Sequence, residues 1–242
     1  MDKPPILSII TVNYNNARNL RKTIFSLKEA RADTEVECIF VDGGSNDESL
    51  SLASSFWSED KLISEPDSGI YNAMNKGLTL AHGKFVLWLN SGDELILGSW
   101  IPAKYVLQTT DADVISFGLE IYNESGAKLL ERRLPNEKML PRRTLPHPSS
   151  IFRRDIILNL GGYDESFKIA ADRFVFLTLH QQGAHFIFPK IFLSKFYLGG
   201  ASSSFFDTFY ENKRIDHNFN VIGPLTYSLI KVIQHVHSIF AK

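Results

Sequence analysis

The chain has 242 residues, 44% of them hydrophobic, which is enough to bury one large core and gives no sign of disorder. Its formal net charge of −1 argues against a nucleic-acid-binding protein, because contact with the phosphate backbone needs a clear positive excess. The first apolar run, residues 6–12, is too short for a signal peptide, and no run approaches the roughly 18 apolar residues of a bilayer-spanning helix. The single cysteine, Cys38, lies in an apolar run and is expected to be buried, which fits a reducing compartment.

Strand-like and helix-like segments alternate through the first part of the chain. In order, the expected elements are strand 6–12, helix 17–30, strand 36–41, helix 47–56, strand 61–64, helix 70–81 and strand 85–89. This alternation predicts a parallel, doubly wound sheet with right-handed crossovers between its strands.

Each expected strand ends in a polar cluster. The clusters are 13–16, 42–47, 65–69 and 90–94, the last of which contains Asp93. Because open α/β sheets bind ligands at the carboxyl ends of their parallel strands, we expect the clusters to form one shared site. The alternative is a set of independent turns, with Asp93 capping the next element.

The second half follows a different pattern. The expected elements are strands 113–118 and 119–122, a hairpin turn at 123–126 into 128–133, helices 153–160 and 170–183, and strands 184–188 and 191–197. They indicate mixed or antiparallel strands in this half. A long proline-punctuated connection between residues 135 and 148 is expected to be a mobile segment over the site.

The C-terminal segment from Leu225 to Phe240 carries apolar residues at helical spacing, with lysine and histidine residues between them. Such a helix packs on its own domain, mediates dimerisation or lies on a membrane surface. The pattern alone leaves these three roles open.

Several motifs occur in the order and spacing of a known family. They are SIITVNYN at 8–15, FVDGGSND at 40–47, SEPDSGIYNAMNKG at 64–77, LNSGD at 89–93, GGYDESFKIAAD at 161–172 and LGGAS at 198–202. In these motifs the chain resembles the inverting glycosyltransferases of family 2. The resemblance implies the α/β GT-A fold, with a mixed, mainly parallel sheet flanked by helices. It implies a GT-A domain at 1–204, with a nucleotide-sugar-binding half (1–98) and an acceptor and catalytic-base half (99–204), followed by a helical extension at 205–242.

The resemblance also implies a nucleotide-diphosphate-sugar donor, commonly a UDP-sugar. Asp42 would accept a hydrogen bond from the base, and Asp67 would lie beside the base or the ribose. The residues expected to bind the nucleotide sugar are Thr11, Asn13, Tyr14, Asn15, Asp42, Gly43, Asp67, Ser68, Gly69, Asn72, Lys76, Asn90, Ser91 and Gly92.

Asp93 matches the last acidic position of the family's metal motif and would hold Mg²⁺ or Mn²⁺ against the diphosphate. The family usually has acidic residues at the positions of Asn90 and Gly92. This departure leaves open whether the metal is required.

Asp172 matches the family's catalytic base, which takes the acceptor's proton on the face opposite the leaving group. Ala171 and Phe174 stand where many relatives carry acids, so Asp172 is expected to lack a neighbouring carboxylate that raises its pKa. The alternative is that Asp172 only caps its helix.

His147, Arg142 and Arg143 are candidate contacts to the acceptor or to phosphate. For His147 the alternative is a structural role in a turn between two prolines. For the arginines it is solvated surface charge.

The resulting hypothesis is a bacterial enzyme that adds one sugar per encounter to a lipid-linked or saccharide acceptor in the biosynthesis of O-antigen, capsule or exopolysaccharide. It is expected in the cytoplasm, peripherally at the inner membrane face, with the C-terminal helix as a membrane or homodimer contact. One alternative is a catalytically inactive relative that acts as a scaffold, motivated by Asn90 and Gly92. Another is a sugar nucleotidyltransferase, which needs a glycine-rich and basic first loop that residues 13–16 do not offer.

Overall fold

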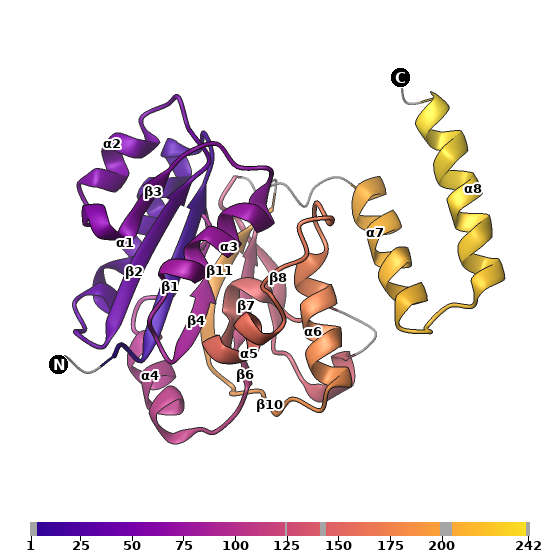
Figure 1. The fold of residues 1–242 in the computed structure, drawn as a ribbon. Helices are drawn as coiled ribbons and strands as arrows, with labels where there is room; N and C mark the ends of the chain where they lie inside the picture. The colour runs from indigo at the N-terminus through magenta and orange to yellow at the C-terminus, as the bar shows by residue number, and fades with distance from the viewer. Residues whose placement is uncertain (1–3, 124, 141–143, 199–204, 241–242) are drawn as a thin grey trace.

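The computed structural model of the chain describes residues 4–123, 125–140, 144–198 and 205–240 (Figure 1). Arg142 and Arg143 lie outside the described residues. The described chain forms two β-sheets, the larger of which is covered by helices, so the predicted α/β class is confirmed.

The larger sheet has seven strands in the order β10-β6-β9-β4-β1-β2-β3. The strands β1 (Leu7–Asn13), β2 (Val36–Asp42), β3 (Leu62–Ser64) and β4 (Phe85–Trp88) pair in parallel. Between them lie α1 (Ala17–Arg31), α2 (Ser49–Ser54) and α3 (Ile70–Leu80), as the sequence predicts. The other members are β6 (Val114–Ser116), β10 (Phe186–Ile187) and the antiparallel strand β9 (Ser150–Arg153).

The smaller sheet contains β5 (Glu94–Leu95), β11 (Phe192–Tyr197), β7 (Gly118–Tyr122) and β8 (Lys128–Arg133), in that order. Strands β7 and β8 form the predicted hairpin, in which the amide of Gly126 donates to the carbonyl of Asn123 at 2.9 Å. The predicted neighbours 113–118 and 119–122 belong to different sheets, because β6 joins the larger sheet and β7 the smaller one.

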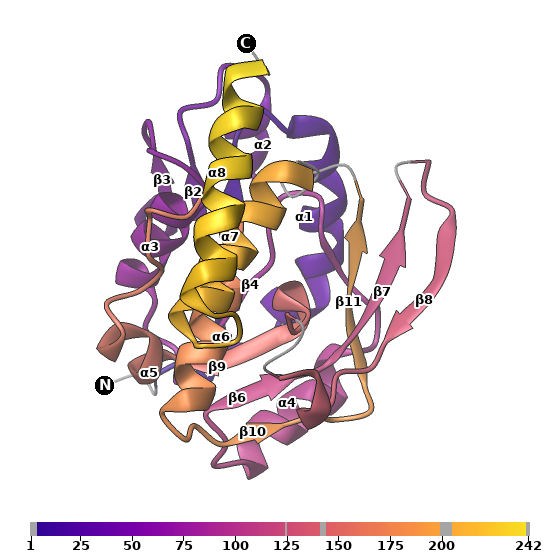
Figure 2. The same cartoon turned by 90° about the vertical axis from the view of Figure 1, so that its right-hand side faces the viewer.

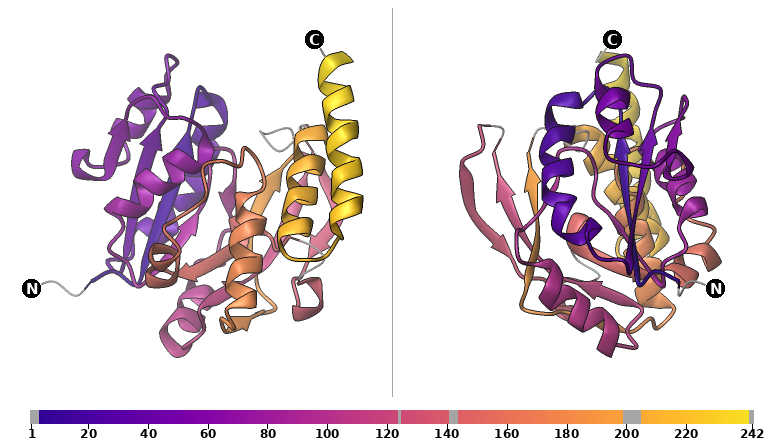
Figure 3. Two further views of the ribbon diagram at one scale, coloured as in Figure 1. Left: turned by 45° about the vertical axis from the view of Figure 1, so that its right-hand side comes forward. Right: turned by 90° about the vertical axis from the view of Figure 1, so that its left-hand side faces the viewer.

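Helices cover both faces of the larger sheet (Figures 1 and 3). One core contains residues of α3, α5 (Arg154–Asn159) and α6 (Ala171–Gln181), and the other contains residues of α1, α2 and α4 (Trp100–Thr109). Successive side chains of β1 alternate between the cores, so Ile9 packs with α1 and Ile10 with α3, both fully buried. Cys38 is buried in the core that contains α1, as expected.

The C-terminal part forms α7 (Phe205–Asn218) and α8 (Pro224–Phe240), so the predicted helical extension is confirmed. Figures 1 and 2 show α7 beside α6 and α8 on the far side of α7. Ile215 of α7 is fully buried in the core that contains α3 and α6. Helix α8 instead exposes Leu225, Leu229 and Val232 by 87%, 62% and 60%. Of the helices that the structure describes, none has the length and apolar character needed to cross a membrane.

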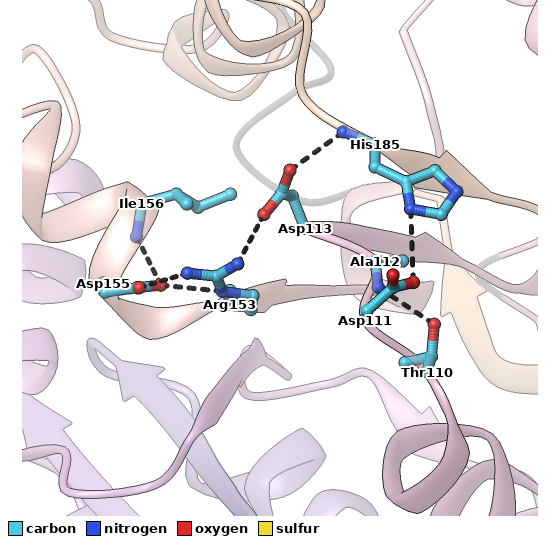
Figure 4. A network of polar contacts seen from close by, with 8 residues as sticks. All are labelled: Thr110, Asp111, Ala112, Asp113, Arg153, Asp155, Ile156 and His185. Carbon is cyan, nitrogen blue, oxygen red and sulfur yellow. Dashed lines mark hydrogen bonds and ion pairs between the residues drawn. The ribbon is translucent and has the colours of Figure 1, made fainter.

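A network of polar contacts connects neighbouring strands at the edge of the larger sheet where β4 begins (Figure 4). Asp113 accepts hydrogen bonds from Nη1 of Arg153 at 3.0 Å and from the amide of His185 at 2.9 Å, which joins β6, β9 and the approach to β10. Arg153 also pairs with Asp155 of α5. A pocket of about 510 Å³ lies at this edge. It is opposite the edge at which β1, β2 and β4 end.

Candidate active site

The last residues of the parallel strands lie side by side at one edge of the larger sheet. In the strand register, Asn13 of β1 is level with Asp42 of β2, and Asp42 is level with Ser64 of β3. The loop after β4 reaches the same edge, because the amide of Ser91 donates to the carbonyl of Val12 at 3.0 Å. The structure thus brings the polar strand ends together.

Asp42 is fully buried and receives hydrogen bonds on both carboxylate oxygens. Oδ1 accepts from Nδ2 of Asn13 at 2.9 Å and from Oγ of Ser45 at 2.5 Å, and Oδ2 accepts from Oγ of Ser64 at 3.0 Å and from the amide of Ser45 at 2.8 Å. Burial acts to raise the pKa of Asp42, but these hydrogen bonds outweigh burial and the pKa lies below its ordinary value. A direct contact between Asp42 and a base stays a prediction, and it requires one of these bonds to open.

Gly43 separates Tyr14 from Asp67. A Cβ atom on Gly43 would lie 2.4 Å from Oδ2 of Asp67 and 3.3 Å from the Tyr14 ring, so a larger residue at position 43 would displace the Asp67 carboxylate. Asp67 accepts a hydrogen bond from the amide of Gly69 at 3.0 Å, and Tyr14 is 64% exposed. These residues form a solvent-facing wall of the kind against which an aromatic base can pack.

The loop before α3 and the first two turns of that helix contact Glu165, which comes from the second half of the chain. Oε2 of Glu165 accepts from Oγ of Ser68 at 3.4 Å and from Nδ2 of Asn72 at 3.0 Å. Oε1 accepts from Nδ2 of Asn75 at 2.9 Å. Glu165 therefore joins the two halves beside the site. The sequence reasoning gave it no role, although it lies inside the motif at 161–172.

Two residues expected at the donor make contacts within the protein. Nζ of Lys76 lies 2.8 Å from Oε1 of Glu65 and donates to the carbonyl of Pro66 at 3.0 Å. Oδ1 of Asn15 accepts from the amide of Asn46 at 2.9 Å. Both residues brace neighbouring loops, and a contact of either with the donor stays a prediction.

Helix α1 fixes the loop that carries Asp93. Oγ1 of Thr23 accepts from the amide of Gly92 at 2.9 Å and donates to the carbonyl of Asp93 at 2.8 Å. Asn16 donates to the carbonyl of Ser91 at 3.0 Å. Gly92 has a φ of 108°, a conformation that favours glycine. The loop after β4 is thus held at several points.

Four buried oxygen atoms at or near these strand ends have no hydrogen-bond partner in the part of the chain that the structure describes. They are Thr11 Oγ1, Asn13 Oδ1, Asn90 Oδ1 and Ser91 Oγ. Buried polar atoms are nearly always hydrogen-bonded, because an unmet one costs free energy. These atoms can therefore be satisfied by a polar ligand.

The chemistry around Asp93 suits a divalent cation. Asp93 is 6% exposed, and burial raises its pKa to about 8, with a further increase from Glu94. The described residues contain no group of three or more His, Cys, Asp or Glu side chains that could hold a metal. Asp93, Asn90 and Ser91 offer oxygen atoms, which Mg²⁺ and Mn²⁺ prefer. This donor set fits a cation that takes its other ligands from phosphate and water.

Asp172 lies part-buried in the first turn of α6, and Ala170 rather than Asp172 is the N-cap residue. Oδ1 of Asp172 accepts from the amide of Arg173 at 2.7 Å. Burial raises the pKa of Asp172 to about 6, while Arg173 lowers it and Glu211 of α7 raises it. The expectation that no carboxylate lies near Asp172 is therefore corrected: Ala171 removes a neighbour in sequence, and α7 supplies one in space.

Two stacked tyrosines line the interior beside Asp172. The ring centroids of Tyr71 and Tyr163 are 5.5 Å apart, and burial followed by the charge of Asp172 raises the pKa of both hydroxyls. The Tyr71 hydroxyl donates to the carbonyl of Ile169 and accepts from the amide of Ala171 at 3.1 Å. Tyr71 thereby satisfies an amide at the start of α6.

His147 lies in the core rather than at the surface. It is 8% exposed, its Nε2 is 2.7 Å from the Tyr163 hydroxyl, and its ring centroid is 5.9 Å from that of Trp88. Burial lowers the pKa of His147 to about 4, so its imidazole is neutral near pH 7. This environment agrees with the structural alternative, and a contact between His147 and an acceptor stays a prediction.

Comparison with known proteins gives a consistent picture. The model of the family described as Glycosyl transferase family 2 matches residues 8–173. A glycosyltransferase of Mycobacterium tuberculosis strain H37Rv is 29% identical over 184 residues, covering 72% of this chain and 68% of that protein. A PGL/p-HBAD biosynthesis glycosyltransferase of the same strain is 29% identical over 179 residues, covering 69% of this chain and 67% of that protein.

Solved structures share the fold at lower identity. Staphylococcus aureus TarS in complex with UDP-GlcNAc superposes with a TM-score of 0.68 at 20% identity, covering 92% of this chain and 68% of that one. The mannosyltransferase PcManGT of Pyrobaculum calidifontis, in complex with GDP-Man and Mn²⁺, gives 0.65 at 16% identity, covering 87% and 61%. The match to the family model, the two-sheet fold and these relatives confirm the expected resemblance. The chain belongs to glycosyltransferase family 2 and is a transferase with the GT-A fold.

Proposed function

We propose that the chain transfers a single sugar from a nucleotide-diphosphate sugar, with a UDP-sugar favoured, to a lipid-linked or saccharide acceptor with inversion. The observation that carries this proposal is the set of buried oxygen atoms without a described partner at or near the carboxyl ends of the parallel strands, together with the buried Asp93 in the loop after β4. The complexes of TarS with UDP-GlcNAc and of PcManGT with GDP-Man and Mn²⁺ support the class of donor.

The donor would lie along the strand ends. The wall of Tyr14, Gly43 and Asp67 would contact the base and ribose, and Oδ1 of Asn13 would accept a hydrogen bond from the nucleotide. Asp93 would hold a divalent cation against the diphosphate. Such a cation, when bound, supplies positive charge that stabilises the departing diphosphate.

Asp172 would act as the base. Inversion requires attack from the face opposite the leaving group, so one carboxylate must take the proton of the acceptor hydroxyl there. A pKa of about 6 leaves Asp172 ionised near pH 7 and close enough to that pH to accept a proton. The neutral hydroxyls of Tyr71 and Tyr163 add no competing charge beside it.

The acceptor is proposed to be part of surface polysaccharide biosynthesis at the inner membrane face. Support comes from α8, whose exposed Leu225, Leu229 and Val232 lie at helical spacing near Lys231. An amphipathic helix of this kind can lie at the interface of an anionic bilayer.

Asp172→Asn tests the proposal. We expect the variant to release nucleotide from UDP-GlcNAc or GDP-Man, with a saccharide acceptor present, roughly 10²–10⁴-fold more slowly than the wild type. Donor affinity, measured by calorimetry, is expected to stay nearly unchanged, because Asp172 does not belong to the donor-binding strand ends. Equal turnover by the two proteins would reject the role of Asp172.

The second candidate function is a catalytically inactive scaffold. It is motivated by Asn90 and Gly92, which stand where the family's metal motif usually carries acids, and by the lack of an acidic cluster in the described residues. This candidate predicts that Asp172→Asn preserves the biological role. Loss of polymer in cells that carry the variant would reject the scaffold.

A further inference from the structure

Helix α7 contacts the segment that leads into α6. Nη2 of Arg214 donates to Oγ of Ser166 at 2.9 Å, and its guanidinium lies 4.2 Å from the centroid of the Phe167 ring. Ile215 of the same helix is fully buried. The start of α6, which carries Asp172, is therefore packed against a helix from the C-terminal extension.

Glu211 of α7 accepts hydrogen bonds from three consecutive backbone amides of that segment. Its Oε1 accepts from the amide of Lys168 at 2.7 Å, and its Oε2 accepts from the amides of Ile169 and Ala170, each at 2.9 Å. The amides at the start of a helix have no partner within the helix and must be satisfied from elsewhere. Here the carboxylate of Glu211 satisfies three amides directly ahead of α6 and so fixes the backbone that leads to Asp172.

The second contact concerns Arg173, the residue that follows Asp172. Its Nη2 lies 2.7 Å from Oδ1 of Asp216, and its Nη1 donates to the carbonyl of Asn212 at 3.1 Å. Lys213 also pairs with Asp216, at 2.8 Å. The buried guanidinium of Arg173 is thus directed toward α7, although Asp172 is its neighbour in the chain.

We propose that α7 positions the base of the transfer reaction: Glu211 fixes the backbone ahead of Asp172, and Asp216 keeps Arg173 from pairing with it. The proposal rests on the function proposed above. The charged and titratable groups that face Asp172 are Tyr71 of α3, Tyr163 of the preceding segment, Arg173 of α6 and Glu211 of α7. Glu211 and Asp216 act through the backbone and through Arg173, so both are positioning residues rather than catalytic ones.

The experiment measures kcat, donor KM and the pH profile of kcat/KM for Glu211→Gln and Asp216→Asn. Glutamine has one acceptor oxygen in place of two, so Glu211→Gln leaves backbone amides unmet and is expected to lower kcat roughly 10–10²-fold with little change in donor KM. In Asp216→Asn, Arg173 can turn to Asp172. Because a cation beside Asp172 lowers its pKa, the acidic limb of the kcat/KM profile is then expected to shift to lower pH by about one unit or more.

Two further variants separate positioning from folding. Asp207→Asn removes an exposed carboxylate from the same helix and is expected to behave as the wild type. Arg173→Met with Asp216→Asn removes the buried cation, which lowers the pKa of Asp172 in the wild type, so the acidic limb of the double variant is expected at the wild-type position or at higher pH. An unshifted limb in Asp216→Asn, or activity losses that only follow the loss of folded protein, would overturn the proposal.

Asp172→Asn, measured beside the wild type in the same series, distinguishes failure of the proposed function from failure of the positioning role of α7. If the wild type itself releases no nucleotide, the proposed function fails. If Asp172→Asn is as active as the wild type, the role of Asp172 as base fails and the positioning role fails with it. If Asp172→Asn is inactive while Glu211→Gln and Asp216→Asn behave as Asp207→Asn, only the positioning role fails.

Discussion

Nδ2 of Asn13 donates to Oδ1 of Asp42 at 2.9 Å, and this bond between the ends of β1 and β2 decides which way the Asn13 amide faces. With the nitrogen on Asp42, Oδ1 of Asn13 is the atom left buried without a partner in the described chain. The bond therefore prepares an acceptor for a donor group on a ligand. Asp42 serves here as the residue that orients Asn13.

Asn13→Leu keeps the volume of the side chain and removes this acceptor. We expect nucleotide affinity to fall roughly 10–100-fold, because the cost of losing a hydrogen bond in a buried site is about 1–3 kcal/mol. Asp42 retains Ser45 and Ser64 as partners, so the fold should survive. Calorimetry with UDP measures the effect. The exposed Asn46→Leu in the neighbouring loop is the control, and equal affinities of the two variants would contradict this role of Asn13.

Gly43→Ala places a Cβ atom 2.4 Å from Oδ2 of Asp67, the end of a side chain that can move. Asp67 is expected to turn away, with roughly 10-fold weaker nucleotide binding and little loss of stability. Asp67→Ala should give a similar loss, and adding Gly43→Ala to it should change little further, as a double-mutant cycle would show. Additive losses would mean that Gly43 acts independently of Asp67.

Asp93→Asn tests the cation. The pKa of Asp93 is raised to about 8, so near pH 7 the carboxyl holds a proton that a metal must displace. Titration of the wild type with Mn²⁺ and UDP should therefore release a proton, seen as heats that depend on the buffer. Asp93→Asn should lose both binding of Mn²⁺ and this release. Asp111→Asn, which removes a 95% exposed carboxylate at the opposite edge of the sheet, is the control. Metal binding by Asp93→Asn equal to that of the wild type would exclude Asp93 as ligand.

His147 makes stability depend on pH. Burial lowers its pKa from the ordinary value of 6.5 to about 4 in the folded protein. Between these values the unfolded chain binds a proton that the folded chain does not, so the free energy of unfolding falls as the pH falls. The difference amounts to about 3 kcal/mol. Asp93 and Asp172, whose pKa values are raised, act in the opposite direction, so only a comparison of variants isolates His147.

Urea unfolding of His147→Gln at neutral and acidic pH gives that comparison. In His147→Gln, the part of the fall in unfolding free energy at acidic pH that is due to His147 is expected to disappear. His185→Gln, which alters a side chain that is 57% exposed, should keep that part. A pH dependence in His147→Gln like that of the wild type would show that the imidazole is not buried in its neutral form.

Leu229→Glu tests contact between α8 and a membrane. Leu229 is 62% exposed, and if the apolar stripe of α8 enters an anionic bilayer, the variant should bind phosphatidylglycerol vesicles about 10-fold more weakly or worse. Ser228→Glu adds the same charge at the neighbouring exposed position and should cost less. Equal vesicle binding, together with a change of oligomeric state in Leu229→Glu, would instead assign the stripe to a dimer.

The first half of the fold could be predicted from two signals in the sequence. Each parallel strand from β1 to β4 is an apolar run that ends in polar residues, and each of β1 to β3 is followed by a segment with helical spacing of apolar residues. Those signals are local in sequence. Strand β9 and the break between β6 and β7 were not predicted, since a short buried strand has no periodicity of its own and the choice of sheet depends on distant partners. Helix α4 was also missed, although Trp100, Ala103 and Leu107 are its buried residues at helical spacing.

The same limit applies to the site. Asp93 and Asp172 could be singled out from motifs, but their surroundings could not, because Thr23 of α1 and Glu211 of α7 reach them only in the folded chain. His147 shows the reverse case. Its flanking prolines are visible in the sequence, whereas its burial against Trp88 is not.

The measurement that tests the central claim most directly is calorimetric titration of the purified protein with UDP, GDP and dTDP, each with Mn²⁺ and again with excess chelator. We expect one nucleotide, with UDP favoured, to bind in the presence of Mn²⁺, and we expect the chelator to weaken or remove this binding. Absence of binding for every nucleotide under both conditions would contradict a donor site at the ends of β1, β2 and β4.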